Sequence, residues 1–130
     1  MAALTAKELR DWLKPQVSSP SWTIGRLDST KSQTICIYSG LTPQTAIHNV
    51  AGSKGTYKPV GFRVLIRWTN DFAASSEKAA EVYEVLAQRS RSIAGKMAYI
   101  FHRFSEPVNL GSADDGVFEQ AVDITIITER

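Results

Sequence analysis

Cys36, His48 and His102 are the residues whose side chains could act as nucleophile, general base or metal ligand. Cys36 lies between two isoleucines, and a thiol in an apolar strand usually behaves as a small buried hydrophobic group. Neither histidine has a carboxylate or a second histidine at a suitable spacing. We therefore expect no catalytic residue, and one cysteine with two histidines cannot form a zinc cluster.

Two short segments have the composition of ligand sites but not the spacing. The GSKG sequence at 52–55, which includes Lys54, lacks the GxxxxGK[ST] pattern of a phosphate-binding loop and has no strand leading into it. The DDG sequence at 114–116 offers two carboxylates without a third oxygen ligand, which is typical of a turn. The sequence therefore predicts no cofactor and no metal.

Arg63 and Arg67 share one face of a predicted strand, where they could contact phosphates or acidic side chains of a neighbouring subunit. A solvated outer face explains the same alternation. The chain has 15 Lys and Arg residues against 13 Asp and Glu, a net charge of only +2. This is far from the concentrated basic surface that predicts DNA binding, so charge does not identify a partner.

The length of 130 residues, with 43% hydrophobic residues, fits one folded domain over residues 1–130. A single cysteine excludes an intrachain disulfide and favours assembly in the cytoplasm. The charged N-terminal segment MAALTAKELRDWLK does not resemble a secretion signal, and no later stretch approaches the roughly 20 apolar residues of a membrane span. We expect no membrane partner.

The first predicted helix runs over about 4–14. Thr5 and Glu8 have the spacing of a capping box, and Pro15 ends the helix. The second predicted helix runs from Ser76 to about Arg91, with Ser75 or Ser76 as the N-cap and Gly95 after its end. Apolar residues recur at helical spacing in both: Leu9, Trp12 and Leu13 in the first, and Ala79, Ala80, Val82, Tyr83, Leu86 and Ala87 in the second.

Four strands are predicted, over 34–38, 60–69, 97–104 and 117–128. In the second of these, the apolar residues Val60, Phe62, Val64, Ile66 and Trp68 alternate with polar ones. A long loop over about 40–58, with a short strand near 46–50, separates the first two strands. We expect an α+β fold: a small, mixed, mainly antiparallel sheet of about four strands packed against two helices.

Two blocks of this sequence resemble phage tail terminator proteins of long non-contractile-tailed phages. FRVLIRWTNDFAASSEKAAEVYEVL resembles the middle of those proteins, and LGSADDGVFEQAVDITII resembles their Leu-Gly pair, acidic turn and final strand. Together the blocks cover roughly half the chain, chiefly 62–128. The matching positions are Arg67, Asp71, Ala79, Ala80, Tyr83 and Leu86 in the first block, and Leu110, Gly111, Asp114, Asp115, Gly116 and Phe118 in the second.

The resemblance implies a structural virion protein of the phage neck, not an enzyme. Such a protein forms a homo-oligomeric, hexameric ring that caps the tail tube protein, ends tail polymerisation and joins the head connector or stopper protein. It would be assembled in the host cytoplasm and located at the tail-head junction. The genome DNA would pass through the ring without specific binding.

A closed ring needs two different complementary faces on each subunit. We expect the subunit or partner interface to include Trp12, His48, Lys54, Tyr57 and Lys58, and we expect Arg63 and Arg67 to face the channel. Related neck proteins leave a head-completion adaptor or stopper as the alternative function. A third reading is a small ligand-binding or enzymatic α+β domain whose pocket uses Tyr57, His102 or Cys36.

Overall fold

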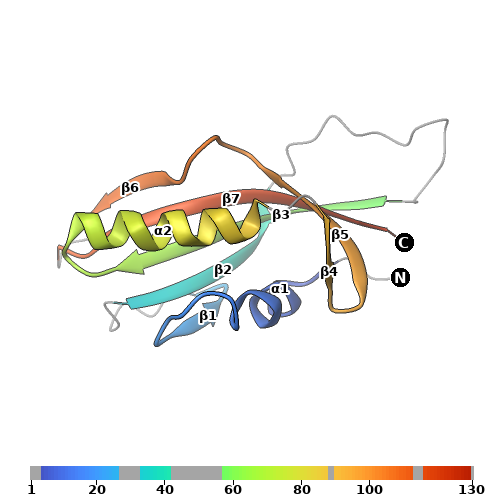
Figure 1. Ribbon diagram of the computed structural model, residues 1–130, viewed down its shortest axis with the longest axis horizontal. Coiled ribbons are helices and arrows are strands. Elements are labelled where there is room, and N and C mark those ends of the chain that lie inside the picture. Colours follow the sequence, from blue (N-terminus) through green and yellow to red (C-terminus); the bar gives the residue numbers. More distant parts are fainter. Residues whose placement is uncertain (1–3, 27–32, 42–56, 88–89, 113–115, 130) are drawn as a thin grey trace.

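The computed structural model describes residues 4–26, 33–41, 57–87, 90–112 and 116–129. These residues form two helices and seven strands (Figure 1). In chain order they are α1 (Ala6–Leu13), β1 (Trp22–Ile24), β2 (Gln33–Leu41), β3 (Tyr57–Trp68), α2 (Phe72–Leu86), β4 (Ser90–Ile93), β5 (Lys96–His102), β6 (Val108–Ser112) and β7 (Phe118–Glu129).

The strands form one sheet in the order β1-β2-β3-β7-β5-β4. All neighbours pair antiparallel except β1 and β2, which are parallel. One edge of β7 pairs with β3 from end to end, and its other edge pairs first with β6 and then with β5. The α+β class and the mainly antiparallel sheet are therefore confirmed, while the expected number of about four strands is too low.

The N-terminal helix has the predicted capping box. The Thr5 side chain accepts a hydrogen bond from the Glu8 backbone N–H, and a Glu8 carboxylate oxygen accepts one from the Thr5 backbone N–H. Glu8 also accepts two hydrogen bonds from Lys96 at the start of β5, at 2.8 and 3.0 Å. The hydrogen bond from Lys96 is the largest cause that lowers the pKa of Glu8 below its usual value, and the hydrogen bond from the Thr5 backbone acts in the same direction. They tie α1 to the β4–β5 hairpin, which lies beside it in Figure 1.

The second helix differs from the prediction at both ends. It begins at Phe72 because Asp71, and not Ser75 or Ser76, caps it: Asp71 Oδ1 accepts from the Ala73 N–H at 3.0 Å. It ends at Leu86, and the chain then forms β4 where the helix was expected to continue. Ala94 and Gly95, with φ of 52° and 76°, make the turn between β4 and β5, so Gly95 belongs to a hairpin and not to a helix end.

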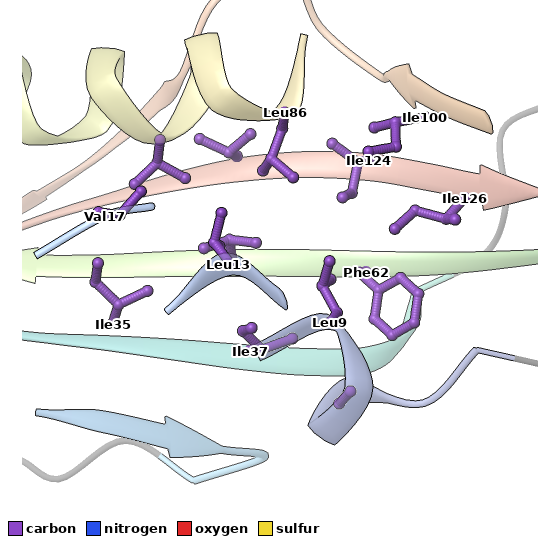
Figure 2. Close-up of a cluster of buried hydrophobic side chains, with 14 of the residues drawn as sticks. Leu9, Leu13, Val17, Ile35, Ile37, Phe62, Leu86, Ile100, Ile124 and Ile126 are labelled. Carbon is purple, nitrogen blue, oxygen red and sulfur yellow. The ribbon is translucent and has the colours of Figure 1, made fainter. Parts of the chain in front are cut away.

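Both helices lie on the same face of the sheet, with α2 against β3 and β7 and α1 against β1, β2 and β4. Leu9 and Leu13 of α1 and Leu86 of α2 point at the apolar side chains of that face, including Phe62 and Ile124 (Figure 2). All five are 0 or 1% exposed. These side chains between the helices and the sheet form the main core, and their burial supplies most of the hydrophobic stabilisation that holds the helices to the sheet.

The predicted alternation of β3 is confirmed. Phe62, Val64, Ile66 and Trp68 belong to the core under the helices. The intervening positions, Arg63, Leu65 and Arg67, therefore lie on the other face, which no helix covers in the described part of the chain. We call this the helix-free face.

The expected loop over 40–58 is shorter at both ends, because Gly40 and Leu41 belong to β2, and Tyr57 and Lys58 to β3. The register of β2 and β3 shifts at Leu41. A Cβ atom at Gly61 would overlap the Leu41 carbonyl oxygen, which explains the glycine in an otherwise apolar strand. The short strand expected at 46–50 lies outside the described residues.

Candidate functional site

Two ion pairs cross the helix-free face from β3 to β7. Arg63 Nε and Nη2 donate to the two carboxylate oxygens of Asp123 at 2.7 and 2.9 Å. Four residues later in β3, and four residues earlier in β7, Arg67 Nη1 donates to Glu119 at 3.3 Å. The antiparallel register places Arg63 opposite Asp123 and Arg67 opposite Glu119. Each arginine thus has a carboxylate partner within its own chain.

Burial differs between the two arginines. The Arg67 side chain is only 3% exposed, whereas that of Arg63 is 38% exposed over an Asp123 side chain of which 2% is exposed. The hydrogen bonds from Arg63 to Asp123 raise the pKa of Arg63 further above its usual value, so its charge is permanent. Of the two candidate channel residues, only Arg63 is accessible from outside this subunit.

Two hollows flank Arg63 on the helix-free face. The first, which we call the β2–β6 groove, has a volume of about 520 Å³ and is lined by Tyr38, Leu41, Arg63, Leu65, Leu110 and Glu119 among others. The second has a volume of about 560 Å³ and lies under the bend between β5 and β6, next to Phe104, Pro107 and Asp123. Both have walls that are mostly apolar, so they suit protein side chains better than ions.

Cys36 lies in an apolar cluster. Cys36 is fully buried on the helix-free side, against Leu65 and Ala121, as predicted. No group of three or more His, Cys, Asp or Glu residues in the described ranges could hold a metal ion. No helix among the described residues is long and apolar enough to cross a membrane.

His102 joins β5 to α2. Its ring stacks on Tyr83, with centroids 3.7 Å apart and planes 6° apart. Its Nε2 lies 3.1 Å from the Tyr83 carbonyl oxygen, which can only accept, so Nε2 carries the proton of the neutral ring. Its Nδ1 is buried and has no hydrogen-bond partner among the described residues. Burial lowers the pKa of His102, against the opposing effects of the Tyr83 hydrogen bond and of Glu84.

This geometry predicts a stability change in mild acid. Because the pKa of His102 is lower in the folded than in the unfolded chain, His102 favours folding above about pH 6.5, and this contribution falls as the pH drops below that value. Denaturant unfolding between pH 7 and 5 should show a smaller loss of stability for His102→Phe than for the wild type. His48→Gln is the matched control and should keep the pH dependence of the wild type. If the free energy of unfolding of His102→Phe depends on pH as in the wild type, while that of His48→Gln does not, the effect belongs to His48 and the prediction is wrong.

The structure describes the positions of three of the remaining interface candidates, Trp12, Tyr57 and Lys58. Trp12 is half-buried and packs against the main core from α1. Tyr57 and Lys58 pair with Glu129 and Thr128 at the far end of the β3–β7 ladder, and their side chains are outside the described part of the structure. His48 and Lys54 also lie outside the described residues.

Sequence reasoning found the arginines but missed their partners Glu119 and Asp123. The signal was present: Arg63 and Arg67 are four residues apart in one predicted strand, and Glu119 and Asp123 are four residues apart in another. Opposite charges at equal spacing on two antiparallel strands can pair simultaneously. The sequence also did not single out Leu110 as the edge of a groove, because the groove depends on how β6 meets β7.

The whole-chain comparison decides the family. A family model of the bacteriophage tail terminator protein matches residues 4–130. The chain belongs to the bacteriophage tail terminator family. No curated protein and no solved structure gave a match. Membership makes this tail terminator a structural protein of the phage tail and a virion component, and it confirms the resemblance seen in the sequence.

Proposed function

We propose that this tail terminator forms a homo-oligomeric, hexameric ring at the end of the tail tube, stops tube polymerisation there, and joins the tail to the head connector at the tail-head junction. The observation that carries the proposal is the family match over residues 4–130. The protein also exposes apolar side chains on different sides of the sheet, which suits a subunit with more than one contact surface. The tube protein, the connector or stopper protein and other copies of the chain are the partners, with assembly in the host cytoplasm.

The interface candidates Trp12, His48, Lys54, Tyr57 and Lys58 remain part of this proposal. The genome DNA passes through the ring without specific binding. The pairing of Arg63 with Asp123 and of Arg67 with Glu119 supports this, because a neutralised pair holds phosphate poorly. At these two positions the helix-free face offers a phosphate no unpaired arginine.

The test is the mass of the purified protein by light scattering, alone and mixed with tail tubes that lack their upper end, followed by electron microscopy of the tubes. A ring-sized particle, or added density at one end of each tube, supports the proposal. Binding only to portal-bearing heads would instead favour a head-completion adaptor or stopper. Binding to neither would contradict a neck function and favour the ligand-binding domain.

A further inference from the structure

The β2–β6 groove on the helix-free face has an apolar floor and one charged wall. Leu65 lines the groove, and it packs against the fully buried Cys36 and Ala121 in a small apolar cluster separate from the main core. Leu110 lines the groove from β6 and is 44% exposed. Arg63, with more than a third of its side chain exposed, lies on the polar side. An occupant of this groove needs an apolar group and a nearby negative charge.

A phosphate or a nucleic acid does not meet this requirement. Nε and Nη2 of Arg63 already donate to the buried Asp123 carboxylate, which neutralises the guanidinium and leaves only the N–H groups of Nη1 outside this pair for one further acceptor. Glu119, which also lines the groove, would repel a polyanion. A protein segment that brings one carboxylate next to a large apolar side chain fits better than a ligand with several negative charges.

The chain itself carries such a projection on the opposite side of the sheet. Phe72, the first residue of α2, is 48% exposed. Its ring meets Phe118 edge to face, with centroids 5.3 Å apart, so the exposed ring is held in position. Phe118 shares a face of β7 with Val122, which lies under the helices. Asp71, beside Phe72 in the chain, is exposed and supplies the negative charge.

We infer that Phe72 of one copy of this chain docks into the β2–β6 groove of the next copy, against Leu65 and Leu110, with Asp71 close to Arg63. The inference rests on the proposed ring and names the surfaces that would close it. A groove and a projection on opposite faces of one sheet cannot meet within a subunit. A two-fold dimer would have to make both groove-to-Phe72 contacts in one interface, which patches on opposite faces of the sheet do not allow, so the contact repeats head to tail, as a ring requires. This assignment places Arg63 at a subunit contact and not in the channel.

Cross-linking of the assembled protein tests the contact. The double variant Phe72→Cys/Leu110→Cys, assembled on tail tubes and treated with a short bismaleimide, should give a ladder of covalent oligomers on a denaturing gel. An equimolar mixture of the two single variants should give covalent dimers that contain one copy of each. The wild-type protein should give no product, since its only thiol, Cys36, is fully buried.

The matched control is Phe72→Cys/Met97→Cys. Met97 is 43% exposed and lies on the helix-free side of β5, outside the groove. The same ladder from this control, or dimers formed between two Phe72→Cys copies, would overturn the contact. Capped tubes without any ladder would also overturn it while leaving the proposed function intact. A ladder from a protein that leaves tube ends bare would support the contact and contradict the proposed function.

A second pair of variants covers the case in which a cysteine at Phe72 weakens assembly. Phe72→Ala and Leu110→Glu change exposed side chains, so both should fold normally, and each should weaken self-association about tenfold or more. Leu110→Glu adds a charge that repels Asp71. Met97→Glu should associate like the wild type. Wild-type association of both Phe72→Ala and Leu110→Glu would overturn the inference.

Discussion

Phe62→Ala should lower the free energy of unfolding by about 3–5 kcal/mol, the range for removing a large aromatic side chain from a packed core. Phe62 is fully buried and lies between the sheet and α1, near Leu9 and Ile37 (Figure 2). Its loss would leave a cavity in the main core, in the layer between the sheet and α1. Denaturant unfolding followed by tryptophan fluorescence measures the change.

The matched control for this prediction is Phe101→Ala. Phe101 is the same residue type, but it is 41% exposed on the other side of β5. Its replacement should change stability by no more than about 0.5 kcal/mol, as for most surface substitutions. Equal losses in the two variants would mean that Phe62 does not lie in the main core.

Breaking the ion pair on the helix-free face should have an unequal effect at its two ends. Arg63→Met leaves the Asp123 carboxylate, of which 2% is exposed, without its partner, and should cost about 2–3 kcal/mol. Asp123→Asn leaves a guanidinium that is 38% exposed and can be hydrated, so it should cost about 1 kcal/mol. Unfolding of both variants at pH 7 measures the difference.

The double variant Arg63→Met/Asp123→Asn completes the cycle. It should lose less stability than the sum of the two single variants, since the second change removes the group that the first left unpaired. A larger loss for Asp123→Asn than for Arg63→Met would contradict the burial of the carboxylate. Strict additivity would show that the two side chains do not interact.

The parts of the fold that the sequence predicted are those fixed by local contacts. The capping box of Thr5 and Glu8 lies within four successive residues, and the alternation of β3 follows from the pleat of a strand with one face toward the main core. Such signals need no knowledge of what lies across the sheet.

The missed elements depend on tertiary contacts. Strand β1 has three residues and gains its pairing from β2, and β4 gains its pairing from β5. The sequence predicted that the second helix continues to about residue 91, because no glycine or proline stands near its true end at Leu86. The hairpin turn at Ala94 was also missed, since a positive φ is rare for a non-glycine residue. The second helix end and the number of strands were therefore wrong.

The same division applies to the candidate site. Alternation alone placed Arg63 and Arg67 on one face, and the structure confirms that shared face. Whether they face solvent depends on Asp123 and Glu119, which are more than 50 residues away in the sequence. The two hollows beside them form only where β6 and the bend before it meet β7, so no local sequence pattern predicts them.

The most direct test of the proposed function is the growth of tail tubes. Purified tube protein would be allowed to elongate from preformed tubes, with and without this protein, and tube lengths would be measured by electron microscopy. The proposed function predicts that added protein binds the growing end and halts elongation, so that lengths stay at their value at the time of addition. Continued elongation at the same rate, with the protein present in excess over tube ends, would contradict it.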